Sequence, residues 1–199
     1  MTRVLLVCGS QRGASLNARL LDALAGALPA GAVADRLRPA EVDLPLFDAD
    51  REGEPALVAR VRALHARFCA ADALIVASPE YNGLMTPFLK NLVDWVSRLP
   101  YRDPALTGAF ADKPVLLAAT SPGWSGGAVG IPALRALFGY CGAVVFGEAL
   151  TIPYGDRAIA PDGTLDPAFA GTWWRDCVAR FAAVAMRMKG IPIVKGSGT

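Results

Sequence analysis

Short apolar runs alternate with longer segments of helical periodicity along most of this chain. Each run has the length of a buried strand, and each longer segment places its large apolar residues on one helical face. Such an alternation predicts a parallel sheet with right-handed crossovers and helices on both faces. The runs that predict strands are residues 3–8, 33–37, 73–77, 114–120 and 143–146.

Prolines and small polar residues mark the ends of the helices between these runs. Ser15 precedes the first helical stripe, Pro29 ends it, and Pro55 opens the second helix. Later helices are predicted at residues 87–99, 131–140 and 167–188. The segments 43–54, 101–112 and 152–166 are expected to be a surface loop, a linker and a turn-rich stretch.

Five such strands favour a three-layer α/β/α fold of the flavodoxin-like kind, with the parallel strand order 2-1-3-4-5, at least as well as half of a Rossmann fold. We assign residues 1–190 to a single domain and residues 191–199 to a C-terminal tail. In this strand order the switch point lies between the first and third strands, and ligands bind there, outside the carboxyl ends of the strands.

Composition and charge argue against several classes of function. The chain is 53% hydrophobic, but no stretch is long enough to span a membrane, and no signal peptide is recognisable. The formal charge of +2 comes without a basic run, which makes nucleic acid an unexpected partner. The four cysteines have no paired spacing, which argues against a disulfide framework or a metal site. We therefore expect a cytoplasmic protein that binds neither membrane, nucleic acid nor metal.

The loop after the first strand gathers hydrogen-bond donors around a helix start. Ser10, Arg12, Ser15 and Asn17 surround free backbone N–H groups and the positive end of the helix dipole, an arrangement that favours an anion. The spacing matches neither GxxxxGK[ST] nor GxGxxG, so a phosphomonoester fits better than a triphosphate or a dinucleotide. The plainer alternative is that Ser15 only caps the helix and Arg12 is solvated.

The loop after the third strand offers a wall for a flat ring. An aromatic ring, a carboxylate and an Asn-Gly pair that tolerates positive φ stand just before Thr86 and Pro87, which predict the next helix start. The alternative is an ordinary turn between strand and helix. The residues predicted to bind a ligand are Pro79, Glu80, Tyr81, Asn82 and Gly83.

The loop after the fourth strand is rich in glycine, which lets a backbone approach a ligand closely. Ser121, Gly123 and Gly126 are predicted to take part, and a flexible turn without a ligand is the alternative. Three loops of this kind on one sheet edge indicate a site more strongly than any one of them alone.

Together these residues resemble the NADPH-dependent FMN reductase family. The pieces that carry the resemblance are GSxRxxSxN at residues 9–17, PEYNG at 79–83, LKNxxDW at 89–95 and SxGxxGG at 121–127. The resemblance implies a flavodoxin-like fold that binds FMN, with the first loop on the phosphate and the other two around the isoalloxazine. Residues 84–88 depart from the pattern of many relatives and are more apolar, which bears on the identity of the acceptor.

The resemblance also implies an activity. NADPH or NADH would reduce the flavin, which would then reduce a small acceptor such as a quinone, an azo compound, chromate or free flavin. Because the cofactor carries this chemistry, we assign no catalytic side chain. The alternatives are an FMN electron carrier served by a protein partner and a phosphate-binding module without flavin.

Three further expectations concern residues outside the loops. Lys90 and Asp94 are four residues apart and are expected to pair. His65 lies among arginines and is expected at the surface. A homodimer or homotetramer is expected, as in the family, and also because the third helix carries more apolar residues than one buried stripe needs, namely Trp95, Val96 and Leu99.

Overall fold

A five-stranded parallel sheet in the order β2-β1-β3-β6-β7 forms the centre of the molecule. The computed structural model describes residues 1–190, and the predicted tail lies outside the described residues. The order is the predicted 2-1-3-4-5, and the flavodoxin-like fold is confirmed. The strands are β1 (Thr2–Cys8), β2 (Ala32–Leu37), β3 (Ala73–Ala77), β6 (Pro114–Thr120) and β7 (Val144–Ile152).

The central strands β3 and β6 are buried along their whole length. Their sequences, ALIVA and PVLLAAT, are continuously apolar because helices cover both faces of the sheet. Two hydrophobic clusters, one on each face, result from this arrangement. Leu74 illustrates the registers, since it lies beside Leu5 of β1 and Val115 of β6.

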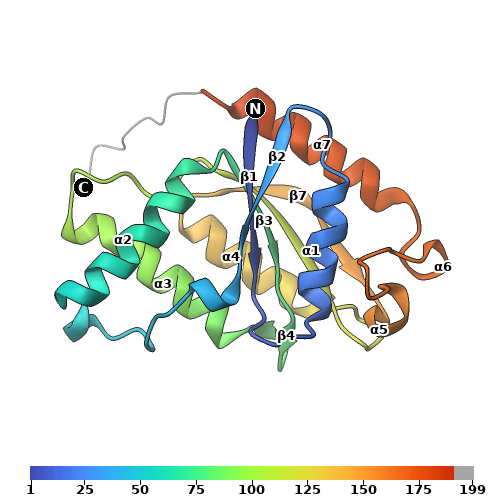
Figure 1. Ribbon diagram of the computed structural model, residues 1–199, viewed down its shortest axis with the longest axis horizontal. Coiled ribbons are helices and arrows are strands. Elements are labelled where there is room, and N and C mark those ends of the chain that lie inside the picture. The colour runs from blue at the N-terminus through green and yellow to red at the C-terminus, as the bar shows by residue number, and fades with distance from the viewer. Residues whose placement is uncertain (191–199) are drawn as a thin grey trace.

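Helices form the two outer layers, as Figure 1 shows. α1 (Leu16–Gly26) and α7 (Trp173–Met188) pack on one face of the sheet. α2 (Pro55–Ala70), α3 (Pro87–Arg102) and α4 (Ile131–Tyr140) pack on the other. No helix of residues 1–190 is long and apolar enough to cross a membrane.

The predicted helix starts are confirmed in detail. Ser15 Oγ accepts a hydrogen bond from Ala18 N, and Thr86 Oγ1 accepts one from Leu89 N, each at 3.2 Å. Proline opens both α2 and α3, where its missing N–H is not needed.

Several predicted boundaries were wrong. The last helix is interrupted: α6 (Pro167–Ala170) ends at Gly171, whose φ of 63° breaks the helix before α7 begins. β7 extends well beyond residue 146, and α3 continues through Pro100, so the predicted linker starts later. The turn-rich stretch contains the short helix α5 (Gly155–Ala158).

Two expectations about side chains also change. His65 is buried, with 4% of its surface exposed, because α2 turns it toward the segment that follows α3. Trp95, Val96 and Leu99 lie in the core of the chain itself, so they leave no spare apolar face on α3. The oligomer stays a prediction without that support.

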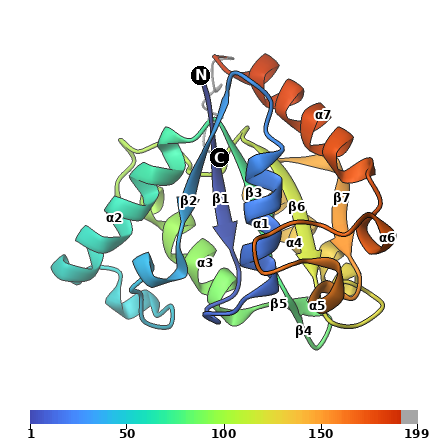
Figure 2. The same cartoon turned by 45° about the vertical axis from the view of Figure 1, so that its right-hand side comes forward.

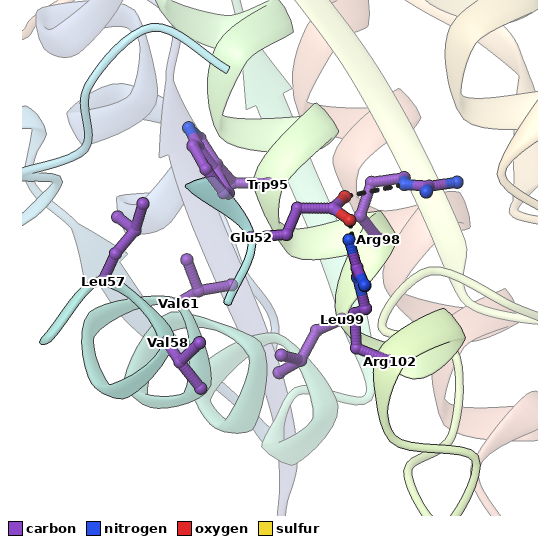
Figure 3. Close-up of a pocket in the computed structure, with 8 residues that line it drawn as sticks. All are labelled: Glu52, Leu57, Val58, Val61, Trp95, Arg98, Leu99 and Arg102. Carbon is purple, nitrogen blue, oxygen red and sulfur yellow. Dashed lines mark hydrogen bonds and ion pairs between the residues drawn. The ribbon is translucent and has the colours of Figure 1, made fainter. Parts of the chain in front are cut away.

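The segment predicted as a surface loop carries a buried carboxylate, shown in Figure 3. Glu52 follows the 3-10 turn η2 (Ala49–Arg51), and its side chain is 4% exposed. Its carboxylate accepts hydrogen bonds from Arg98 Nε at 2.9 Å and Arg102 Nε at 2.7 Å, both on α3. The space beside these ion pairs measures about 10 Å³, which is room for no more than a water molecule. The ion pairs therefore do not form a ligand site. They act as a structural clamp that fastens the segment of Glu52 to α3.

Burial of Glu52 tends to raise its pKa, but the hydrogen bonds and charges of Arg98 and Arg102 outweigh burial and hold the pKa below its ordinary value of 4.5. A carboxyl whose pKa is lower in the folded state adds stability at neutral pH. That stability is lost as the pH falls below about 4.5 and through the folded-state pKa.

We predict that Glu52→Gln lowers the free energy of unfolding at pH 7 by about 1–2 kcal/mol, because both arginines lose a charged acceptor but can turn to solvent. Urea unfolding at pH 7 and at pH 4 measures the effect, and the difference from wild type should shrink at pH 4. The matched control is Glu54→Gln, which breaks the exposed pair with Arg51 and should change stability less. An equal loss in both variants would show that the buried pair is not a clamp.

Candidate functional site

Three loops meet at the carboxyl edge of the sheet, the lower edge in Figures 1 and 2. They follow β1, β3 and β6, which are neighbours in the sheet. The first two loops are fastened to each other: Gly9 N donates to Ala77 O at 2.8 Å, and Thr86 Oγ1 donates to Gly9 O at 2.5 Å. A Cβ at position 9 would lie 2.6 Å from Ser78 Oγ, so only glycine allows this approach.

Some polar side chains of the first loop form hydrogen bonds inside the protein, and others are exposed to solvent. Ser10 and Ser15 are buried, and their hydroxyls accept hydrogen bonds from Arg12 N at 3.3 Å and Ala18 N at 3.2 Å. Arg12 is exposed, and its guanidinium makes no ion pair within residues 1–190. Burial raises the pKa of the nearby Cys8 thiol, which keeps it protonated and unreactive. Arg12 and the start of α1 are thus the part of this loop that is available to an anion.

Asn17 has a role that the sequence did not reveal. Its side chain is 3% exposed and forms two hydrogen bonds to the backbone of Thr120, from Nδ2 to the carbonyl at 2.9 Å and from Thr120 N to Oδ1 at 3.1 Å. This pair ties the start of α1 to the end of β6, just before the third loop. The partners are 103 residues apart, and no local signal marks such a contact. A direct contact of Asn17 with phosphate stays a prediction.

The second loop contains a small hairpin that was not predicted. β4 (Glu80–Tyr81) and β5 (Leu84–Met85) pair antiparallel around Asn82 and Gly83, whose φ values of 53° and 78° are typical of a two-residue hairpin turn. The Asn-Gly signal therefore does set a turn, but the turn joins two short strands rather than a strand and a helix, as the plainer alternative supposed. The turn leaves the Tyr81 side chain half exposed at the edge of the sheet.

Glu80 connects the second loop to the third. Its Oε2 accepts a hydrogen bond from Gly130 N at 2.8 Å, and its Oε1 accepts one from Ser125 Oγ at 3.2 Å. Both carboxylate oxygens are thus engaged with the segment that leads into α4. Glu80 positions the loops, and its contact with a ligand stays a prediction, as does that of Pro79, whose carbonyl accepts a hydrogen bond from Ser78 Oγ at 2.9 Å.

The third loop is packed rather than flexible. A Cβ on Gly126, whose φ is 58°, would lie 2.6 Å from the carbonyl carbon of Ile152. The carbonyls of Ser121 and Gly123 accept hydrogen bonds from Gly155 N at 2.8 Å and Tyr154 N at 3.1 Å. The end of β7 therefore fixes the shape of this loop.

A groove of about 330 Å³ lies between the first and second loops. It brings Arg12 together with Tyr81, as the predicted phosphate and ring contacts require. Ser121, Gly123 and Gly126 do not line this groove, and their contact with a ligand stays a prediction. The lining residues are Gly9, Gln11, Arg12, Tyr81, Thr86, Pro87 and Phe88.

The chemistry of the groove suits a ligand with an anionic end and a flat ring. Arg12 provides positive charge and hydrogen-bond donors, and Tyr81, Pro87 and Phe88 provide apolar surface. The residues present thus fit a flavin mononucleotide. Within residues 1–190 no group of histidine, cysteine, aspartate and glutamate side chains could hold a metal ion.

Comparisons with known proteins agree with this geometry. The sequence is 39% identical over 126 residues to the quinone reductase of Escherichia coli strain K12, which covers 63% of each chain, so the match spans less than two thirds of that relative. It is 30% identical over 164 residues to the 2-hydroxy-1,4-benzoquinone reductase of a Burkholderia species, covering 82% of this chain and 85% of the relative. The solved structure of FerB, a flavoenzyme NAD(P)H:(acceptor) oxidoreductase from Paracoccus denitrificans, superposes with a TM-score of 0.80 at 26% identity, covering 94% of this chain and 99% of FerB.

The family model described as NADPH-dependent FMN reductase matches residues 2–156, which include all three loops. This match covers more than half of the chain, so the chain belongs to the NADPH-dependent FMN reductase family.

Proposed function

We propose that this protein is an FMN-dependent NAD(P)H oxidoreductase that reduces a small acceptor of the quinone class. The observation that carries the proposal is the groove at the switch point of the sheet, lined by Arg12 and Tyr81 from two different loops. The names of the similar proteins described above, a quinone reductase and a 2-hydroxy-1,4-benzoquinone reductase, support the same class of reaction.

The redox chemistry, uptake of hydride from a nicotinamide and its release to an acceptor, is supplied by FMN when it is bound. The side chains of this protein bind and orient. Arg12 and the N–H groups at the start of α1 would hold the phosphate, and Tyr81 would lie along the ring. The two hydrogen bonds between Asn17 and Thr120 hold the start of α1 against the end of β6.

The third loop would stabilise negative charge that develops on the ring during reduction. Gly126 N and Gly127 N already donate within the loop, at 3.3 Å to Gly123 O and 3.4 Å to Ser125 Oγ. Within the described part of the chain, the backbone N–H groups of Trp124 and Ser125 make no such bond, which makes them the better donors to a ligand. This refines the expectation that the loop as a whole contributes.

The surface around the hairpin suits a flat, apolar acceptor. Tyr81 is 50% exposed and Leu84 is 58% exposed on the hairpin. Val129, which lies next to Gly83, and Trp124 of the third loop are also exposed. Quinones are planar and bury their ring faces well on such side chains. The apolar composition of residues 84–88 agrees with this preference.

The first of three predictions from the proposed function concerns activity. Protein that has been incubated with FMN and freed of excess flavin should retain a flavin spectrum that bleaches when NADPH or NADH is added without oxygen, and a quinone should restore it. Retained flavin that neither donor bleaches would instead indicate an electron carrier served by a protein partner. A protein that binds no FMN and oxidises no NADPH with excess FMN would refute the proposal.

The second prediction concerns the phosphate contact. Arg12→Ala should weaken FMN binding by roughly 1.5–3 kcal/mol, because a charged hydrogen bond to the phosphate is lost. Fluorescence titration measures the affinity. Arg187→Ala is the matched control, since it removes the same charge from the last turn of α7, far from the groove, and should leave the affinity unchanged. Equal affinities of Arg12→Ala and wild type would remove Arg12 from the site.

The third prediction concerns the connection between the loops. Glu80→Ala should lower FMN affinity about tenfold, because Gly130 N and Ser125 Oγ lose their acceptor and the third loop loosens. Glu80→Gln should restore part of the affinity, since its amide oxygen can still accept from Gly130 N. The same titration compares the three proteins, and full affinity in Glu80→Ala would show that the loops hold their shape without this residue.

A further inference from the structure

A cluster of side chains that could act as nucleophile, base or acid lies at the opposite edge of the sheet, where β3 and β6 begin. Cys69 and His65 are one turn apart on α2, and Thr107 and Lys113 belong to the segment between α3 and β6. Cys69 is exposed, whereas Cys8 and Cys177 are buried and Cys141 is partly buried. The proposed reductase reaction uses none of the residues in this cluster.

The contacts of His65 determine which of its ring nitrogens carries the proton. Its Nε2 lies 2.9 Å from the carbonyl oxygen of Thr107. A carbonyl only accepts hydrogen bonds, so Nε2 carries the proton and Nδ1 keeps its lone pair. Burial lowers the pKa of His65, the hydrogen bond to Thr107 opposes that effect, and the charge of Arg62 adds to it. His65 is therefore neutral at pH 7 and able to accept a proton.

The thiol of Cys69 lies within reach of this base. Its Sγ is 3.6 Å from His65 Nδ1 and 3.7 Å from Nε2, so the sulfur rests against the imidazole ring. Thr107 Oγ1 lies 4.0 Å from the same sulfur. A nucleophile beside a base that a third group orients is the arrangement by which proteins activate thiols.

Charged groups also surround the pair. Lys113 Nζ donates to Ala71 O two residues beyond Cys69; burial lowers the pKa of this lysine, while the charges of Cys69 and Asp72 raise it. Asp72 is itself paired with Lys189, and Arg62 is paired with Asp103, so these two ion pairs largely balance their own charges.

We propose that Cys69 is a nucleophilic thiol, activated by His65, that forms a mixed disulfide with low-molecular-weight disulfides. The Cys69 proton moves to His65 Nδ1, the thiolate attacks one sulfur of the disulfide, and a new S–S bond forms as the old one breaks. The leaving thiolate takes the proton from His65, so the exchange needs no other oxidant. The reaction is reversible by any free thiol.

This site is separate from the flavin groove. β3, five residues long, runs from the Cys69 cluster to the loop that carries Tyr81, which places about 17 Å of strand between them. A result for or against the reactivity of Cys69 therefore says nothing about the proposed reductase function. A Cys69→Ser variant should keep the same NADPH oxidation as wild type.

The experiment follows the reaction of the folded, full-length protein with 5,5′-dithiobis(2-nitrobenzoate) by the absorbance of the released thiolate, from pH 5.5 to 9. We expect one fast thiol that disappears in Cys69→Ser. In His65→Gln, whose amide nitrogen can still donate to Thr107 O, the rate at pH 6.5 should fall about tenfold or more, because an unassisted thiol is mostly protonated there. Mass spectrometry of the peptide containing Cys69 identifies the modified residue.

Two outcomes would overturn the proposal. One is a fast phase that persists in Cys69→Ser, and the other is an equal rate at pH 6.5 in wild type and His65→Gln. If His65→Gln does not fold, the pH profile of wild type decides. A rate that rises tenfold per pH unit up to about pH 8.5 describes an ordinary thiol and contradicts the proposal, whereas a shoulder below pH 7 supports it.

Discussion

The burial of β3 and β6 on both faces is the constraint on which the rest of the structure depends. Strands without a polar face must be covered on both sides, so helices of the chain pack on both faces of the sheet, α1 and α7 on one and α2, α3 and α4 on the other. Parallel strands also place all of their carboxyl ends at one edge. The three loops meet there as a result of how the core is buried, before any ligand is considered.

At that edge, most polar side chains serve the protein rather than a ligand. Ser15 caps α1, Asn17 holds the end of β6, and Glu80 holds the start of α4. What remains for a ligand is the guanidinium of Arg12, the ring of Tyr81 and backbone N–H groups. Such a site binds by shape and by fixed dipoles, which suits a cofactor that brings its own reactivity.

The sequence predicts local features well and long-range contacts poorly. The caps at Ser15 and Thr86 and the turn at Asn82-Gly83 follow from short patterns, because the responsible atoms are within a few residues of one another, while the strand order follows from the alternation of strands and helices along the chain. The break at Gly171 was missed, since a single glycine in a helical pattern is compatible with either outcome. The burial of His65 and Glu52 depends on partners from other elements, and charged neighbours in the sequence suggested the surface instead. The resemblance to a family predicts which loops hold the ligand, but it does not reveal the hydrogen bonds by which Asn17 and Glu80 connect those loops to other elements.

The close packing of the third loop against β7 has a consequence for how this protein could diversify. Gly126 and Gly127 have no room for a side chain, because the backbone at Ile152 and the methyl group of Ala119 occupy that space. Trp124 and Leu84, in contrast, extend into solvent. The two glycines that shape the third loop therefore tolerate no side chain, while the exposed residues Trp124 and Leu84 are free to vary. A protein built in this way can change its preference for an acceptor through substitutions at a few exposed residues, without disturbing the loops that would bind the cofactor.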